Sequence, residues 1–171
     1  MKNRLIGLII VVCLVLASSG CTNNTQLSES TGIPVSEAPN LASEISKSTG
    51  SVQTIQFKGL TLNMNQCMYI LSKAIVMINN GEKGNIPIKT FSNAPSPSGT
   101  VNSARIAKNE YVDLADRTYQ WMDQNGKVPN HGGVFQAGVN DFTPDMMLKL
   151  YVKVLTEYKS TGQLPDAVTV P

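Results

Sequence analysis

Residues 125–129 read Asn-Gly-Lys-Val-Pro and directly follow an apolar run with helical spacing. The same stop, Gly-x-aliphatic-Pro, occurs as Gly-Asn-Ile-Pro at 84–87 and as Gly-Gln-Leu-Pro at 162–165. Glycine ends a helix in the left-handed conformation, and a proline shortly afterwards prevents the helix from resuming. Successive prolines lie about 40 residues apart, a period typical of repeat proteins. The repetition indicates a small array of similar units rather than one irregular catalytic core.

The runs that precede the three stops predict three helices. The first covers about 64–79 and opens with Asn63 in a capping box, and the second covers about 110–124. The third is capped by Thr143, with Pro144 in its first turn. No unit could bury its apolar stripe alone. The predicted fold is therefore mostly α: a small array of helix, Gly-x-aliphatic-Pro stop and short extended piece, packed into one compact domain after a signal peptide and a flexible tether.

The segments between the helices carry weaker patterns. Residues 52–62 alternate in part and contain a Lys-Gly turn at 58–59, which makes a short hairpin-like segment possible. Residues 91–109 are polar and interrupted by proline and glycine, so they are expected to lack regular structure. Residues 168–170 read Val-Thr-Val, a short β-prone end.

The amino-terminal residues 1–21 have the features of a secretory signal. Lys2 and Arg4 precede an apolar run at 5–17 that is too short to cross the hydrocarbon core of a bilayer. Small residues then lead to Cys21, which resembles the end of a lipoprotein signal, where the cysteine is lipidated after cleavage. Cleavage nearby without an anchor, or an uncleaved anchor, are the alternatives.

The composition after the leader separates a tether from a domain. Residues 22–46 are rich in Ser, Thr, Asn, Pro and Glu, and they are predicted to form a flexible tether ahead of a domain at 47–171. Outside the leader, basic and acidic residues are equal in number. Without a block of like charge, nucleic acid is not expected as a partner.

The residue types needed for catalysis are scarce. Cys67 lies in the middle of the first predicted helix among apolar residues, and His131 is the only histidine. A thiol in that position behaves as a small hydrophobic residue, and a lone histidine makes a poor metal site. The sequence offers no evident nucleophile–base pair, metal cluster or phosphate loop, so we expect no enzyme activity, no cofactor and no metal.

The later units resemble the pseudomurein-binding repeat, in which a helix closes in Asn-Gly-x-aliphatic-Pro-Asn-Tyr-Val. The segments that carry the likeness are 68–75, 86–89, 97–101, 111–115, 125–130 and 158–170. Together they cover roughly residues 50–171. His131 and Ala167 stand where the repeat has tyrosine, so two sites are weakened here if those aromatic rings contact glycan.

The resemblance implies a cell-surface protein of a methanogenic archaeon that docks on the pseudomurein wall, through the glycan or the peptide of that wall. The family is best known from wall-lytic endoisopeptidases with a separate cysteine-protease domain, for which this chain has no room. The function predicted is non-catalytic binding to pseudomurein by a secreted protein, lipid-anchored through Cys21 to the outer face of the cytoplasmic membrane, within the cell wall. The alternative is a surface lipoprotein adaptor whose repeats bind another protein.

The candidate ligand-binding residues come from the last two units. They are the polar residues that follow each stop, two helix-borne aromatics and the two stop prolines: Asn130, Asp166, Trp121, Tyr158, Pro129 and Pro165. Each has a structural alternative, because helix-borne aromatics usually lie in a core and a Gly-x-aliphatic-Pro stop shapes the chain by itself.

Overall fold

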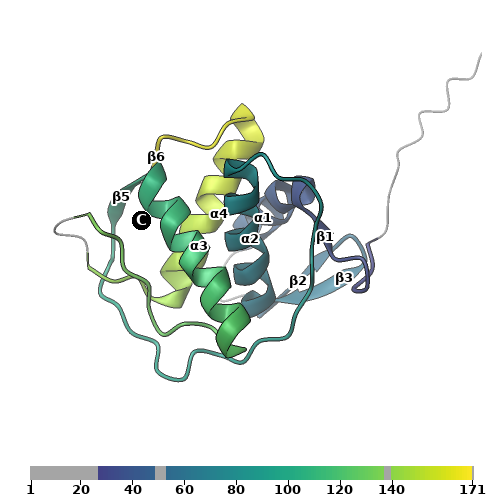
Figure 1. The fold of residues 1–171 in the computed structure, drawn as a ribbon, viewed down its shortest axis with the longest axis horizontal. Coiled ribbons are helices and arrows are strands. Elements are labelled where there is room, and N and C mark those ends of the chain that lie inside the picture. The colour runs from purple at the N-terminus through teal and green to yellow at the C-terminus, as the bar shows by residue number, and fades with distance from the viewer. Residues whose placement is uncertain (1–26, 49–52, 137–139, 171) are drawn as a thin grey trace, which may run out of the picture.

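The computed structural model describes residues 27–48, 53–136 and 140–170 (Figure 1). The predicted signal peptide, including Cys21, lies outside these residues. The four helices are α1 (Ala38–Lys47), α2 (Met64–Asn79), α3 (Lys108–Asn125) and α4 (Pro144–Thr161). The strands are β1 (Ile33–Pro34), β2 (Thr54–Phe57), β3 (Leu60–Asn63), β4 (Asn85–Ile86), β5 (Ala104–Ala107) and β6 (Ala167–Val170), and a short 3-10 turn spans Val35–Glu37. No helix within the described residues is long and apolar enough to span a membrane.

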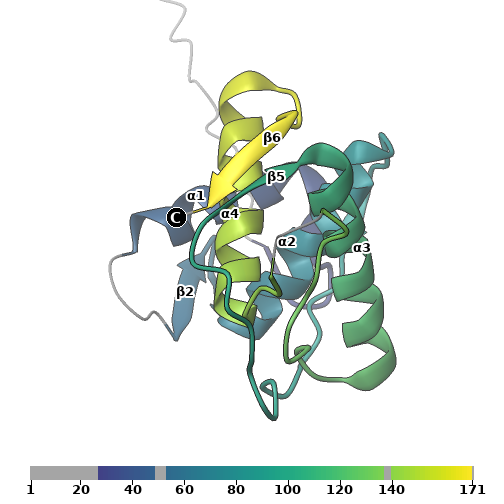
Figure 2. The same ribbon diagram turned by 90° about the vertical axis from the view of Figure 1, so that its left-hand side faces the viewer.

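The strands form three separate two-stranded antiparallel sheets. β2 and β3 make the hairpin that the sequence suggested, turning at Lys58 and Gly59, which both have positive φ. β1 pairs with β4, with Ile33 opposite Ile86. β5 pairs with β6, with Ile106 opposite Val168, and the two strands lie side by side in Figure 2.

The two long-range sheets divide the described chain into halves with a similar order of elements, except that the first half has the β2–β3 hairpin between its two helices. In the first half, strand β1 leads to α1 and α2, and β4 returns to pair with β1. In the second half, β5 leads to α3 and α4, and β6 returns to pair with β5. The helices of the two halves also pack in a matching way. The first helix of each half packs mainly on the second helix of the other half, α1 on α4 and α3 on α2. Each half is thus closed by its own first and last strands.

The prediction of a mostly α array of helix-and-stop units is wrong. Of the described residues, 47% are helical and 18% lie in strands or bridges, so the fold is mixed. The three stops also play unlike roles. Gly126 and Gly162 end α3 and α4 in the left-handed conformation, whereas Gly84 precedes strand β4 and a different glycine, Gly81, follows the cap of α2. Strand β4 lies within the first stop, and only the last stop is followed by a strand, β6, whose pairing with the distant β5 local sequence patterns do not predict.

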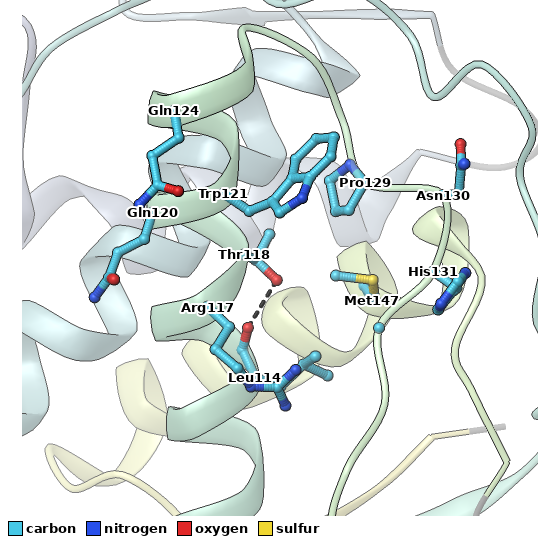
Figure 3. Close-up of a pocket in the computed structure, with 11 residues that line it drawn as sticks. Leu114, Arg117, Thr118, Gln120, Trp121, Gln124, Pro129, Asn130, His131 and Met147 are labelled. Atoms are coloured by element: carbon cyan, nitrogen blue, oxygen red, sulfur yellow. Dashed lines mark hydrogen bonds between the residues drawn. The ribbon is translucent and has the colours of Figure 1, made fainter.

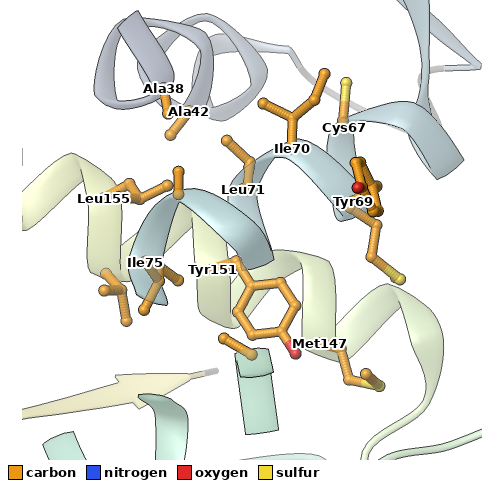
Figure 4. Close-up of a cluster of buried hydrophobic side chains, with 14 of the residues drawn as sticks. Ala38, Ala42, Cys67, Tyr69, Ile70, Leu71, Ile75, Met147, Tyr151 and Leu155 are labelled. Carbon is orange, nitrogen blue, oxygen red and sulfur yellow. The ribbon is translucent and has the colours of Figure 1, made fainter. Parts of the chain in front are cut away.

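The core lies between α2, α4 and the helices that flank them (Figure 4). Its largest fully buried side chains include Tyr69, Tyr111 and Tyr151, one from each of the three long helices. Cys67 is also fully buried, as expected for a core residue, and burial raises the pKa of its thiol to about 12. The thiol therefore stays protonated near neutral pH, and a protonated thiol is a poor nucleophile.

The prediction of a flexible tether at residues 22–46 is wrong from β1 onward. Residues Ala38–Lys47 form helix α1, and its Ala38, Leu41 and Ala42 are fully buried (Figure 4). The helix has only one narrow apolar stripe among Ser, Glu and Asn residues, so its composition resembles that of a disordered segment. Packing against α4, which the composition does not reveal, stabilises it.

The connector at 87–103 is irregular and passes close to the C-terminal end of α3 in space (Figure 1). Ser92 pairs there with the stop, donating its N–H to Gly126 O at 3.0 Å and accepting from Val128 N at 2.9 Å. The expectation of no regular structure through residue 109 fails at Ala104–Ala107, because these residues form β5 only by pairing with β6.

Candidate functional site

A groove of about 450 Å³ lies between helix α3 and the loop that follows it (Figure 3). Gln120, Trp121 and Gln124 line it from the helix, and Pro129 and Asn130 line it from the loop. The left-handed cap at Gly126 reverses the chain, and buried Val128 then anchors the loop to the body of the protein. The sequence motif thus builds a groove by returning the chain along the helix that it has just ended.

The floor of the groove is apolar and closely packed. Leu114 and Met147 lie beneath it, and Gly132 packs directly against both. A Cβ at Gly132 would lie 2.6 Å from Leu114 Cδ1 and 2.9 Å from Met147 Sδ, so a larger residue would require these two side chains to shift. Below the floor, the Thr118 hydroxyl donates to Leu114 O at 2.7 Å and shares a hydrogen bond with the Tyr151 hydroxyl.

Asn130 holds the loop to the connector. Its side-chain Oδ1 accepts a hydrogen bond from Ser96 N at 2.8 Å, and its backbone O accepts one from Ser98 N at 2.9 Å. The Nδ2 group donates no hydrogen bond within the described residues, and the side chain lines the groove. Asn130 therefore has a structural bond on one side and a free donor on the other.

Three polar side chains meet where the connector, the loop and the start of α4 come together. Ser98 Oγ is 3.1 Å from His131 Nδ1, and His131 Nε2 is 3.8 Å from Asp141 Oδ2. The sequence did not predict this Ser–His–Asp row, because its members come from separate segments. The 3.8 Å distance is too long for a hydrogen bond, and the His131 and Asp141 side chains are 51% and 54% exposed. In this geometry the aspartate does not orient the imidazole as it does in a catalytic triad.

The polar lining of the groove contains amides, one indole, the His131 imidazole and one fixed cation, Arg117, and no carboxylate. Lys127 lies over the Trp121 ring at 5.9 Å from its centroid. Arg117 is paired with Asp113 at 2.7 Å, and its Nη2 donates to Gly133 O at 2.6 Å. Such a surface can donate and accept hydrogen bonds and stack on a flat group without a strong charge preference.

The six candidate residues fall in three places. Trp121, Pro129 and Asn130 share the groove. Pro165 and Asp166 lie at the other end of α3, where Lys108 N donates to Asp166 O. Tyr158 lines a separate cavity of about 260 Å³ with residues from the end of α2 and the 3-10 turn. The candidates therefore do not form one site.

The polar groove residues Arg117, Gln120 and Gln124 are not among the binding residues predicted from the sequence. They are spaced at i, i+3 and i+7 on α3, which is a helical face, and that spacing was the available signal. Within the described residues there is no group of three or more His, Cys, Asp or Glu side chains that could hold a metal ion.

The segment that forms most of the groove matches a known class of binding repeat. Residues 102–134 match the sequence model of the pseudomurein-binding repeat, so the chain carries one such repeat over β5, α3 and the following loop. All residues that line the groove except Met147 lie within the match. The repeat suggests a cell-wall-binding role, with pseudomurein as partner and the cell surface as location. No curated protein and no solved structure shows a significant match to this chain.

Proposed function

We propose that this protein is a non-catalytic module that binds the pseudomurein cell wall in the groove between α3 and residues 129–132. The observation that carries the proposal is the coincidence of the groove with the matched repeat, because both are built from the same helix and the same loop. A repeat that is named for binding and that forms a polar, aromatic groove has the surface such a role requires.

The chemistry of the groove supports binding rather than catalysis. Its amides and its indole can fix the orientation of a ligand, and the His131 imidazole is the one lining group of a kind that serves as a general base. The Arg117 charge is already neutralised by Asp113. The contact of His131 with Ser98 has no hydrogen-bonded acid behind it, so we assign it to holding the connector against the loop.

Sedimentation with purified pseudomurein sacs tests the function. The full chain should pellet with the sacs, with an authentic pseudomurein-binding repeat protein as positive control. Asn130→Asp keeps an oxygen that accepts from Ser96 N and removes the Nδ2 donor, so it should weaken retention several-fold without unfolding the protein. Asp166→Ala, at the far end of α3, is the matched control and should pellet like the wild type.

Each outcome has a definite reading. Failure of the wild type to pellet would contradict wall binding and favour the adaptor, in which the repeat binds another protein. Pelleting of the wild type with equal retention of Asn130→Asp would remove Asn130 from the binding site. Weaker retention of Asp166→Ala alone would move the site to the opposite end of the helix.

We further propose that the protein is secreted and held at the outer face of the cytoplasmic membrane by lipid on Cys21. The support is the sequence of residues 1–21 alone, with its positive start, short apolar run and small residues before the cysteine. Mass spectrometry of the mature amino terminus tests it. A terminus at Cys21 with the added mass of lipid is expected, and an unmodified cysteine or a different terminus would refute the anchor.

A further inference from the structure

Phe135 is the one large hydrophobic side chain that is well exposed in the described part of the chain, at 79%. The chain at Phe135 and at Gly133, two residues earlier, is nevertheless held by side chains of α3. Phe135 N donates to Glu110 Oε2 at 2.7 Å, and Gly133 O accepts from Arg117 Nη2 at 2.6 Å. An exposed aromatic ring on a firmly held backbone is an available contact surface, because burying it elsewhere would require breaking both hydrogen bonds.

The ring lies beside a residue that lines the groove. The Arg117 guanidinium lines the groove and lies 5.5 Å from the centroid of the Phe135 ring. Figure 3 shows Arg117 toward one end of the groove, Gln124 toward the other, and Trp121 between them on the same helix. Arg117 therefore connects the Phe135 ring to the groove that Trp121 also lines, and the cation–π contact favours a fixed ring position.

The residues that line the groove indicate which kind of ligand the Phe135 ring would contact. Gln120, Gln124 and Asn130 provide amide donors and acceptors, and no lining residue provides a carboxylate for a cationic group. A sugar ring has an apolar face of C–H groups that stacks on an aromatic ring and a rim of hydroxyls that bond to amides. A charged peptide would instead require unpaired charges of opposite sign, and the Arg117 charge is already paired with Asp113.

We propose that Phe135 is a stacking platform for a sugar ring, and that the part of pseudomurein held by this chain is its glycan. This inference rests on the proposed wall-binding function and deepens it by naming the ligand class and a further contact residue. Phe135 lies one residue beyond the matched repeat, and the residues that hold it, Glu110 and Arg117, lie within the match.

The single tryptophan of the chain provides a direct measurement, because Trp121 lines the groove. The full chain in detergent micelles is titrated with two soluble fractions of the same purified walls, the glycan and the peptide, while its fluorescence is followed. The variants are Phe135→Ala, Phe135→Leu, which is apolar without being aromatic, and Phe135→Tyr, which keeps the ring. Thr169→Ala, an exposed residue on β6, is the control for a surface change remote from the groove.

The glycan fraction should change the Trp121 signal, and the peptide fraction should not. Phe135→Ala and Phe135→Leu should each weaken glycan binding about tenfold, whereas Phe135→Tyr and Thr169→Ala should bind as the wild type does. All variants should keep wild-type thermal stability, since the ring is largely exposed.

Two results would overturn the inference while leaving the wall-binding function intact. One is binding of the peptide fraction in place of the glycan. The other is unchanged glycan affinity in Phe135→Ala together with weaker binding in Asn130→Asp. Equal weakening in all three Phe135 variants would exclude aromatic stacking. Failure of the wild type to bind either fraction or intact sacs would refute the proposed function itself.

Discussion

The hydroxyl of Tyr111 donates a hydrogen bond of 2.6 Å to the backbone carbonyl of Pro165. Tyr111 belongs to the first turns of α3, and Pro165 ends the stop that follows α4, so the bond joins the matched repeat to the last segment of the described fold. Beside it, Lys108 N donates to Asp166 O. Both bonds use backbone oxygens at two residues that the sequence offered as ligand contacts.

Tyr111→Phe should lower the free energy of unfolding by about 1–2 kcal/mol, because the Pro165 carbonyl loses a hydrogen bond in a partly buried setting. Urea unfolding followed by circular dichroism measures the change. Tyr158→Phe is the matched control, since the Tyr158 hydroxyl makes no hydrogen bond within the described residues, and it should change stability less. Equal stability of Tyr111→Phe and wild type would show that the bond contributes nothing to the fold.

Leu41→Ala should destabilise the protein by about 2–5 kcal/mol, since Leu41 is fully buried where α1 packs on α4. Lys47→Ala, on the exposed end of the same helix, should change the free energy of unfolding by no more than about 0.5 kcal/mol. The midpoint of urea unfolding of the full chain distinguishes the two. If both variants unfold with the wild type, the segment before residue 47 behaves as a tether after all.

Alkaline pH should destabilise the fold through its buried tyrosines. Burial, with the hydrogen bond to Asp123, raises the pKa of Tyr69 to about 12, while a tyrosine in an unfolded chain titrates near about 10. Between these values the unfolded chain releases a proton that the folded chain keeps. The contribution of Tyr69 is therefore fully present below pH 10 and is lost as the pH rises toward 12.

Urea midpoints measured between pH 8 and pH 12 should fall above about pH 10. The fall should be shallower in Tyr69→Phe, which has no phenol to titrate, although that variant starts from a lower stability because the bond to Asp123 is gone. Burial also raises the pKa of Tyr111 and of Tyr151, so some dependence on pH should remain. Parallel curves for wild type and variant would contradict the assignment to Tyr69.

Ser98→Ala should leave binding to the wall within about twofold of wild type, because Ser98 N rather than its hydroxyl holds Asn130 O. Neither wild type nor variant should release soluble sugar or peptide from pseudomurein sacs over prolonged incubation. Chromatography of the supernatant tests this. Release by wild type that disappears in Ser98→Ala would reveal a hydrolase that uses the Ser98–His131 pair, and the non-catalytic proposal would be wrong.

Local patterns predicted the parts of the fold that local forces decide. Helix α2 begins at Met64 behind an Asn63 capping box, and α4 begins at Pro144 behind Thr143, as the sequence indicated. The left-handed caps at Gly126 and Gly162 were equally readable. Each of these depends on residues within one turn of a helix terminus, so a short window of sequence contains the information.

The rest depends on contacts between distant segments. Helix α1 is stabilised by α4, and β5 exists only beside β6, so neither has a strong signal of its own. The same distinction applies to the groove. Trp121, Pro129 and Asn130 come together because the stop returns the chain along α3. The place of Tyr158 depends on how the halves assemble, and that of Asp166 on the contact of its segment with the start of α3. The exposed Phe135 carries no periodic pattern and becomes visible only in three dimensions.

The pairing of β5 with β6 has a consequence for anyone wishing to graft this module onto another protein. The family match stops at residue 134, yet β6, the strand that pairs with β5 at the start of the match, begins at Ala167. Excision at the borders of the match would leave β5 without its neighbour and Tyr111 without its carbonyl acceptor. The segment to be transferred is thus much longer than the matched repeat. The number of repeats in a sequence therefore does not give the number of independently folding units.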